Sequence, residues 1–125
     1  MVRCLLIEND ANERQKLSTM VAAFGFECEA LSAEKAASSL MENAPDLILM
    51  EARDDAGSRE LLRLVQYRSE TGSAPVVILY AEKPSLEDVG LAVVAGVAHF
   101  LAKPFDAELL RFKIEQAGLL HRSAA

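Results

Sequence analysis

The stretch Asp46-Leu47-Ile48-Leu49-Met50-Glu51 predicts the fold more directly than any other part of the chain. Its apolar residues follow one another without the alternation that a half-exposed strand shows. A short continuous apolar run is typical of a strand that is covered on both faces, as in a parallel sheet. Residues 46–51 are therefore expected to form a buried strand that ends at a charged side chain, Glu51.

Strand-like runs alternate with longer segments of helical period along the whole chain. This alternation is typical of an α/β domain in which helices cover both faces of a parallel sheet. The sequence predicts a doubly wound, five-stranded parallel sheet, a (βα)5 arrangement of the flavodoxin-like type, in a single domain over residues 1–125. The predicted strands are Arg3–Glu8, Glu27–Leu31, Asp46–Glu51, Pro75–Tyr80 and Ala98–Leu101, and the predicted helices are Ala11–Phe24, Ala33–Asn43, Ser58–Glu70, Leu86–Ala95 and one that starts near Asp106.

Two expectations about local structure follow from residue types. Ser32 stands directly before the second helix and is expected to cap it, because a serine oxygen can accept a hydrogen bond from a free N–H of the first turn. The large apolar side chains of Met20, Phe24, Met41 and Phe112 are most simply assigned to the core.

The composition limits the classes of function. With 51% hydrophobic residues in 125 positions, the chain can bury a substantial core, and its apolar runs of about five to seven residues are too short to span a bilayer. The formal net charge of -6 argues against binding to nucleic acid or an anionic membrane, which requires a basic face. The N-terminus lacks a signal-peptide pattern, so we expect a cytoplasmic location, protein partners, and buried free thiols at Cys4 and Cys28.

The candidate site lies where the predicted strands end. In doubly wound sheets a ligand or reaction site forms at the carboxyl ends of the strands, near the reversal of strand order. Carboxylates, cations, an amide and a phenol are expected at this edge, together with the proline that follows the lysine. The residues are Glu8, Asn9, Asp10, Glu51, Arg53, Tyr80, Lys103 and Pro104. Spacing alone leaves the chemistry of this charged pocket open. No metal site is predicted from the two histidines, His99 and His121, because neither has a partner at metal-ligand spacing.

Four stretches of the chain carry a known pattern: Leu5-Leu6-Ile7-Glu8-Asn9-Asp10, Pro45 to Glu51, Pro75 to Ala81, and Gly96 to Phe105 with its Phe-Leu-Ala-Lys-Pro-Phe ending. In order and spacing they resemble the signature stretches of bacterial response-regulator receiver domains of the CheY-like kind, over essentially the whole chain. The resemblance implies phosphoryl transfer in a two-component system, from a histidine kinase to an aspartate at the end of the third strand. It also implies an acidic pair that holds magnesium, a small hydroxyl residue at the end of the fourth strand, and a lysine that contacts the phosphoryl group.

Several residues depart from this pattern. Glu8 fits the first acid and Lys103 fits the lysine, but Asn9 stands where the second acid would be, and a neutral amide is a poorer magnesium ligand. Glu51 stands at the phosphoacceptor position, where its extra methylene displaces the carboxylate from the in-line geometry of phosphoryl transfer. Tyr80 replaces the small hydroxyl residue and is too large for the inward movement that this residue makes in the family.

The charges at this edge suggest what replaces the metal. Arg53 stands where a backbone carbonyl would bind magnesium in the family, and its guanidinium could reach Glu8 or Glu51. The two glutamates against Arg53 and Lys103 sum to zero, which leaves no unpaired negative charge to require a cation. Magnesium binding is therefore expected to be weak or lost, and no other cofactor is expected. Asp10 either adds negative charge or caps the first helix.

The sequence leaves two roles open for Glu51 and suggests one role for Tyr80. Glu51 could be an inert carboxylate paired with Lys103, or a partial mimic of a phosphorylated aspartate, with one negative charge where a phosphoryl group carries roughly 1.5 to 2. Tyr80 is expected to pack on Phe100, which fits the position of the aromatic that changes rotamer when receivers switch. Such packing would fix that rotamer.

The chain is thus predicted to be a pseudo-receiver, a binding module and not an enzyme, that signals through protein contacts without phosphorylation. The expected partner is a histidine kinase, a phosphotransferase or a downstream regulator. The contact would use the face of the fourth helix, fifth strand and fifth helix, from Lys83–Val94, His99–Leu101 and Asp106–Gln116, and the same face could pair two copies. The alternatives are a receiver that still accepts a phosphoryl group, on Glu51 or another side chain, and a regulatory fragment of a longer protein.

Overall fold

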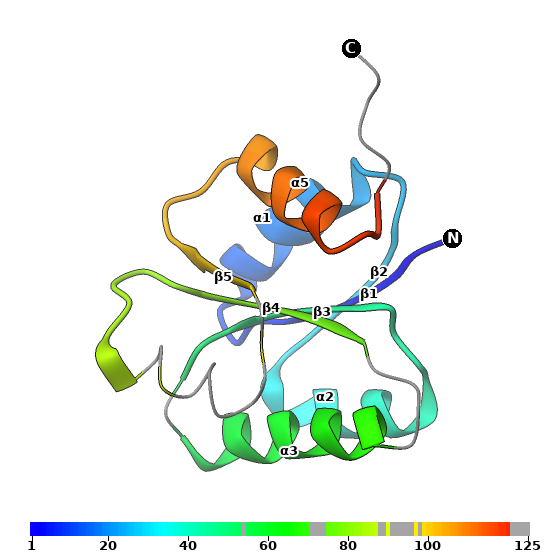
Figure 1. Ribbon diagram of the computed structural model, residues 1–125, viewed down its shortest axis with the longest axis vertical. Coiled ribbons are helices and arrows are strands. Elements are labelled where there is room, and N and C mark those ends of the chain that lie inside the picture. Colours follow the sequence, from blue (N-terminus) through cyan, green and yellow to red (C-terminus); the bar gives the residue numbers. More distant parts are fainter. Residues whose placement is uncertain (54, 71–74, 88–89, 91–96, 98, 121–125) are drawn as a thin grey trace.

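The computed structural model describes residues 1–53, 55–70, 75–87, 90, 97 and 99–120. Strands and helices alternate along the chain as the sequence predicts (Figure 1). The helix expected over residues 86–95 lies largely outside the described residues. The strands are β1 (Arg3–Ile7), β2 (Glu27–Leu31), β3 (Leu47–Glu51), β4 (Val76–Ala81) and β5 (His99–Ala102), and the helices are α1 (Ala11–Ala22), α2 (Ala33–Glu42), α3 (Ala56–Glu70) and α5 (Ala107–Gln116).

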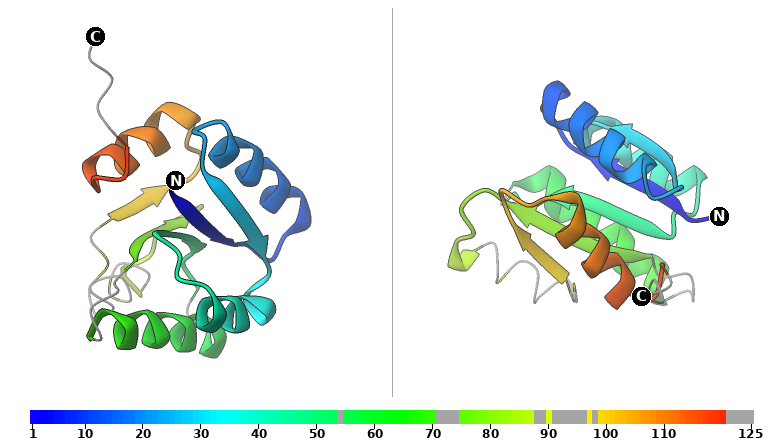
Figure 2. Two further views of the ribbon diagram at one scale, coloured as in Figure 1. Left: turned by 90° about the vertical axis from the view of Figure 1, so that its right-hand side faces the viewer. Right: turned by 90° about the horizontal axis from the view of Figure 1, so that it is seen from above.

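The strands form one parallel sheet in the order β2-β1-β3-β4-β5. This is the flavodoxin-like doubly wound order, in which the strand order reverses between β1 and β3. The two views of Figure 2 show helices on both sides of the sheet. The predicted fold class is therefore confirmed. Because Ile7 pairs with Met50 and Glu51 pairs with Tyr80, the carboxyl ends of β1, β3 and β4 lie side by side.

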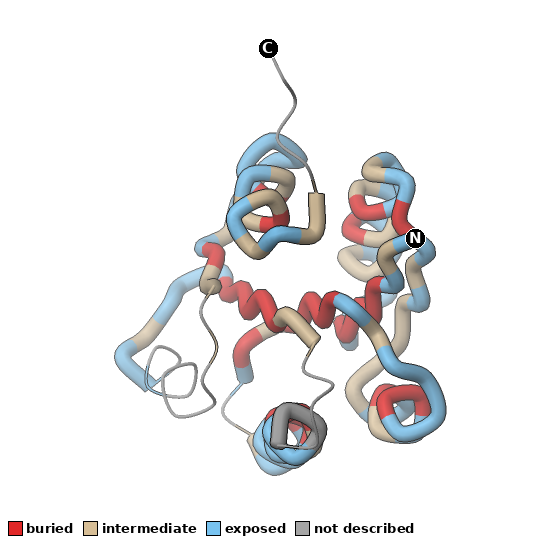
Figure 3. Tube along the Cα trace, turned by 45° about the vertical axis from the view of Figure 1, so that its right-hand side comes forward, coloured by how far each residue is buried: buried red, intermediate tan, exposed pale blue. Residues whose placement is uncertain are grey.

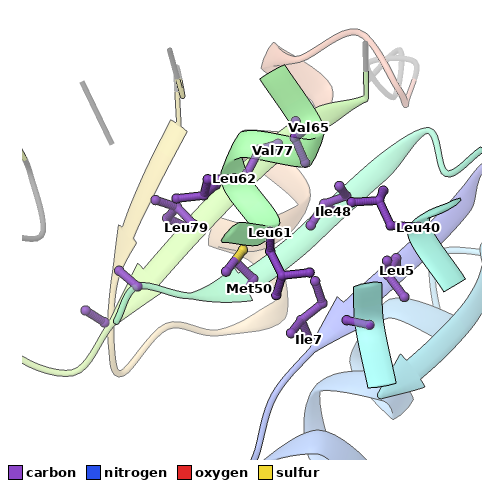
Figure 4. Close-up of a cluster of buried hydrophobic side chains, with 13 residues drawn as sticks. Leu5, Ile7, Leu40, Ile48, Met50, Leu61, Leu62, Val65, Val77 and Leu79 are labelled. Atoms are coloured by element: carbon purple, nitrogen blue, oxygen red, sulfur yellow. The ribbon is translucent and has the colours of Figure 1, made fainter. Parts of the chain in front are cut away.

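Successive residues of the buried strands point into two different cores. In β3, Ile48 and Met50 face α2 and α3, while Leu47 and Leu49 face α1 and α5 (Figures 1 and 4). Both sets are at most 2% exposed, and the central strands form a continuous buried layer (Figure 3). This explains why the sequence of β3 is apolar throughout and does not alternate: each face of the strand needs its own apolar side chains.

Two aspartates fix where α1 and α5 begin. The Asp10 carboxylate accepts a hydrogen bond from the backbone N–H of Glu13 at 2.8 Å, and the Asp106 carboxylate accepts one from Leu109 at 2.9 Å. Each aspartate therefore satisfies a free N–H of a first helical turn. The expectation that Asp10 either caps α1 or adds charge to the pocket is resolved in favour of the cap. At its other end α1 finishes at Ala22, two residues before the predicted end.

The second helix is capped from outside its own sequence neighbourhood. Ser32 is the residue before α2, but its side chain makes no capping hydrogen bond. Instead Asn9, in the loop after β1, accepts the backbone N–H of Ala33 on its Oδ1 atom at 2.8 Å. The prediction that the Ser32 side chain caps α2 was therefore wrong, and Asn9 is the residue whose side chain binds the first N–H of this helix.

Some side chains assigned to the core lie on the surface. Met41 is 61% exposed and Phe112 is 45% exposed, whereas Met20 and Phe24 pack against the core beneath α1 and α5. Apolar residues on a helix are buried only on the stripe that faces the sheet, and Met41 and Phe112 lie outside that stripe. Among the described residues, no helix has the length and apolar character needed to cross a membrane.

Candidate functional site

Polar side chains from four strand ends gather at the carboxyl edge of the sheet. They come from the loop after β1, the end of β3 and its following loop, the end of β4, and the loop after β5. The structure therefore brings the predicted residues to one edge, but it divides them into separate sets of contacts. The residues are Glu8, Asn9, Asp10, Glu51, Arg53, Tyr80, Lys103 and Pro104.

A hydrogen bond between two buried side chains lies at the centre of this edge. The Tyr80 hydroxyl donates to Oε1 of Glu8 at 2.8 Å, and these residues are 0% and 3% exposed. The second carboxylate oxygen of Glu8 accepts the backbone N–H of Asp10 at 3.0 Å. Burial, and then the hydrogen bond to Glu8, raise the pKa of Tyr80 far above its ordinary value, so the phenol stays neutral and remains a donor.

Lys103 contacts Glu13, not Glu51. Its Nζ atom lies 2.5 Å from Oε2 of Glu13 in the first turn of α1, and 5.1 Å from the centre of the Tyr80 ring. The ammonium therefore gains both an ion pair and a cation–π contact. The pairing of Lys103 with Glu51, one of the two alternatives considered for Glu51, is not formed, because α1 begins at the same edge and supplies Glu13. The peptide bond from Lys103 to Pro104 is cis.

The Tyr80 ring packs on Phe105, with ring centroids 5.9 Å apart and an interplanar angle of 70°. Phe100 lies on the other face of the sheet, against the core beneath α2 and α3. The register explains this arrangement: Leu79 pairs with Phe100 and Tyr80 pairs with Leu101, and successive residues of a strand face opposite sides. The predicted packing of Tyr80 on Phe100 was therefore wrong, because the two rings belong to different layers.

Arg53 is shared between two carboxylates. Its Nη1 atom lies 3.7 Å from Oε1 of Glu51, and its Nε atom lies 2.9 Å from Oδ2 of Asp55. Asp55 also accepts the backbone N–H of Ser58 at 2.8 Å, near the start of α3. Of the two carboxylates that Arg53 was predicted to reach, it contacts Glu51, while Glu8 is engaged by Tyr80.

The loop after β1 is held by its own set of hydrogen bonds. Arg14 of α1 donates from Nη1 to the backbone carbonyls of Glu8 and Asn9, at 2.9 and 3.5 Å. The Asn9 and Asp10 side chains are both used as helix caps. The oxygens of this loop therefore face individual donors and not a common centre. Among the described residues, no group of three or more His, Cys, Asp and Glu side chains is placed to hold a metal ion.

The electrostatic environment of Glu51 is unfavourable to its charge. The pKa of Glu51 is raised above its ordinary 4.5, first by burial and then by the negative charge of Glu8, while Arg53 and Lys103 act in the opposite direction. The two cations do not compensate fully, since Lys103 is paired with Glu13 and Arg53 lies closer to Asp55.

Sequence reasoning missed two residues of this edge, Glu13 and Asp55. Glu13 stands three residues after the Asp10 cap, so a helix that starts at the carboxyl edge necessarily carries it there. Asp55 stands three residues before Ser58 and accepts its backbone N–H, which is the spacing of a helix N-cap. Both signals are present in the sequence, but neither residue belongs to the four stretches that carry the resemblance.

Comparisons with known proteins agree with this geometry. A family model described as the flagellar regulatory protein FleQ matches residues 3–111. The regulatory protein AtoC of Escherichia coli (strain K12) is 30% identical over 118 residues, which are 92% of this chain and 25% of AtoC. The chain thus spans about a quarter of the length of this curated relative.

Solved structures of receiver domains have the same fold. A CheY-like response regulator receiver domain protein from Methanospirillum hungatei superimposes with a TM-score of 0.81 at 20% identity, covering 94% of this chain and 93% of that one. The chemotaxis protein CheY4 of Vibrio cholerae gives 0.78 at 18% identity, covering 93% and 98%. The receiver domain in the beryllofluoride-activated NtrC4 dimer gives 0.77 at 21% identity, covering 94% and 96%.

A parallel sheet of this order, with acidic side chains and a Lys-Pro pair at its carboxyl edge, defines the class of response-regulator receiver domains. Within this class, the chain belongs to the family of the flagellar regulatory protein FleQ, whose model matches nearly all of it.

The Tyr80 hydroxyl should stabilise the fold. Tyr80→Phe keeps the ring but leaves Oε1 of the buried Glu8 without its donor, so we expect the free energy of unfolding to fall by about 1–3 kcal/mol. Urea unfolding monitored by circular dichroism measures this change. Tyr67→Phe is the matched control, because Tyr67 is 63% exposed and its change should lie within about 0.5 kcal/mol of zero. Equal effects of the two substitutions would contradict a structural role for the Tyr80–Glu8 bond.

Glu51 should lower stability at neutral pH. Because the folded state raises the pKa of Glu51 above 4.5, ionisation of this residue costs stability as pH rises through that value. Glu51→Gln removes the cost, so the variant should be more stable than the wild type at pH 7, and the difference should shrink towards pH 4. Thermal unfolding across this pH range tests the sign, with Glu108→Gln on the exposed surface of α5 as the control. A variant less stable than the wild type at pH 7 would show that the Arg53 pair outweighs burial.

Proposed function

We propose that this receiver domain acts as a pseudo-receiver: it signals through contact with another protein and does not pass through a phosphorylated state. The hydrogen bond from Tyr80 to Glu8 supports this proposal most strongly. In the resemblance described above, the first acid of the pocket helps to hold magnesium and the residue at the end of β4 reaches the phosphoryl group. Here these two positions bind each other inside the protein.

Magnesium binding is, on this proposal, weak or lost. A magnesium ion requires several oxygen ligands at about 2.0–2.1 Å in octahedral geometry. The Glu8 oxygens accept hydrogen bonds from Tyr80 and from Asp10, and the Asn9 side-chain oxygen accepts one from Ala33. A metal ion would have to displace these donors, and the displaced Tyr80 hydroxyl would be left buried without a partner.

The geometry around Glu51 also disfavours phosphoryl transfer. Phosphoryl transfer depends on an in-line nucleophile and on cations that neutralise the transferred oxygens. Glu51 carries its carboxylate one methylene further out than an aspartate, and its neighbouring cation, Arg53, is also bound to Asp55. Lys103, which would contact the phosphoryl group in the family, is paired with Glu13.

The direct test adds magnesium and acetyl phosphate to the purified domain. A site with a dissociation constant of about 1 mM would add about 1.4 kcal/mol at 10 mM magnesium, which raises Tm by several degrees. We expect a change of Tm below about 1 °C in wild type, and no phosphoryl adduct by intact mass. Glu51→Asp alone should also give no adduct, because Asn9 and Tyr80 remain. An adduct on the wild type would contradict the proposal and support a receiver that accepts phosphate.

The double variant Asn9→Asp/Tyr80→Thr provides the matched gain of function. It frees Oε1 of Glu8 and adds a second carboxylate, so its Tm should rise with magnesium. Each variant is compared with itself in the presence and absence of the ion, so a lower basal stability does not affect the result. A magnesium response that is the same in the wild type and in the double variant would show that hydrogen-bonded Glu8 is not what excludes the ion.

We propose that the protein contact involves α5. Leu109 and Phe112 are 40% and 45% exposed on this helix, and aromatic residues such as Phe are enriched at protein interfaces. The helix belongs to the partner face expected from the sequence, of which residues 88–89 and 91–94 lie outside the described part of the chain. The occupant we favour is a kinase, a phosphotransferase or a downstream regulator. The receiver domain of NtrC4 forms a dimer, so the alternative occupant of this face is a second copy of the chain.

Phe112→Ser should weaken this contact about fivefold or more, since loss of an interface anchor costs more than about 1 kcal/mol. The measurement is co-purification of a protein from the source cell with tagged wild type and variant, followed by titration with the captured partner. Tyr67→Ser removes an exposed aromatic from α3 and serves as the control. Sedimentation velocity of the domain alone detects self-association. Equal loss of binding in both variants, or in neither, would exclude α5 as the contact.

A further inference from the structure

Two cysteines lie opposite each other in neighbouring strands, away from the residues that make up the carboxyl-edge site. Cys4 of β1 and Cys28 of β2 are register partners in a parallel pair, and both are free thiols. Neighbouring strands run about 4.7–4.9 Å apart, and disulfides join residues whose Cα atoms lie about 4.4–6.8 Å apart. The backbone therefore holds these two residues at a separation that a disulfide can bridge.

The two thiols also lie on the same face of the sheet. Both side chains pack in the core beneath α1 and α5, and each thiol shifts the pKa of the other. From α1, the Ser18 hydroxyl donates to the Cys28 sulfur at 3.9 Å. Two thiols that are register partners on one face of the sheet need little backbone movement to become bonded.

The environments of the two thiols differ in a way that gives each a separate role. The neighbouring Cys4 thiol and, less strongly, the hydrogen bond from Ser18 lower the pKa of Cys28 to about 7, against the opposing effects of burial and of Glu29. Cys4 is 3% exposed, and its pKa is raised by the neighbouring Cys28 thiol and by burial. Cys28 is only half-buried, so it is the thiol that carries the thiolate and that a small oxidant reaches first.

We propose that Cys4 and Cys28 form an oxidation site, in which a peroxide converts the two thiols to a disulfide between β1 and β2. The Cys28 thiolate attacks one oxygen of hydrogen peroxide, forming Cys28 sulfenic acid and releasing hydroxide, which takes up a proton to become water. The Cys4 sulfur then attacks the Cys28 sulfur, and the hydroxyl group leaves with the Cys4 proton as a second water. In sum, two thiols are oxidised and one hydrogen peroxide is reduced to two waters.

This site is independent of the proposed pseudo-receiver function. It uses β2, the edge strand of the sheet, and it involves none of the carboxyl-edge side chains. A failed magnesium or phosphorylation experiment would therefore leave the cysteine proposal unchanged, and the converse also holds.

The test treats reduced, folded protein with hydrogen peroxide near pH 8, removes the peroxide, and alkylates remaining thiols in denaturant before intact-mass analysis. We expect the wild type to lose two hydrogen atoms, to resist alkylation at both positions, and to yield a peptide in which Cys4 is linked to Cys28. Treatment with dithiothreitol should restore two alkylatable thiols. Peptide mapping after proteolysis identifies the linkage.

Single variants separate the two roles. In Cys4→Ala the sulfenic acid has no partner in the chain, so dimedone should trap it at Cys28, whereas in Cys28→Ala the remaining Cys4 should stay reduced. The wild-type result decides the proposal even if a variant fails to fold. Two alkylatable thiols after peroxide treatment would overturn it, as would Cys28 oxidised beyond sulfenic acid with Cys4 still free, or a linkage between two chains on a non-reducing gel.

Discussion

The hydrogen bond between the Tyr80 hydroxyl and the buried Glu8 carboxylate determines how the rest of the carboxyl edge is arranged. A carboxylate that is 3% exposed requires donors for both oxygens, and Tyr80 together with the Asp10 backbone N–H supplies them. The tyrosine ring then fills the space between β4 and the loop after β5. Lys103 lies beside that ring and pairs with Glu13 on α1. The Tyr80 phenol thus donates a hydrogen bond to the buried Glu8 carboxylate, and its ring lies beside Lys103. Tyr80 occupies the position at which the receiver pattern has a small hydroxyl residue.

The fold was predictable because the central strands carry apolar side chains for both faces of the sheet. A central strand such as β3 needs apolar side chains on both sides, and this requirement produces the unbroken apolar run of Leu47 to Met50. Helix ends were less predictable. Asp10 and Asp106 act through their own first turns and could be identified locally, but the cap of α2 comes from Asn9, which is distant in sequence from Ala33. Interactions of that kind depend on the strand order, which periodicity alone does not encode.

The site shows a similar division. Its membership was predictable, because parallel strands end at one edge and the residues after each strand must meet there. The ion pairs within the site were not predictable. Several carboxylates compete for each cation, and the position at which a helix starts determines which carboxylate lies nearest. Lys103 was expected to pair with Glu51, although the helix that starts at Ala11 carries Glu13 to the same edge. The contact between Tyr80 and Phe100 could be rejected only once the register was known, because Tyr80 pairs with Leu101 and Phe100 therefore lies on the opposite face.

These contacts change the physical reason for expecting no metal ion. The sequence suggested a neutral pocket, with two glutamates against two cations. The structure adds Glu13 and Asp55: Arg53 pairs with Glu51 and Asp55, Lys103 pairs with Glu13, and Glu8 is bound by the neutral Tyr80 hydroxyl. The edge therefore keeps excess negative charge, in agreement with the raised pKa of Glu51. Negative charge by itself attracts a divalent cation, so neutrality cannot explain a loss of magnesium binding. On the proposed function, the explanation lies in hydrogen bonding. The side-chain oxygens of Glu8 and Asn9 accept from donors of the protein, and the buried Tyr80 hydroxyl would cost about 1–3 kcal/mol if it lost its acceptor. The proposed pseudo-receiver state thus depends on how the oxygens of Glu8 and Asn9 are used and not on the sum of charges around them.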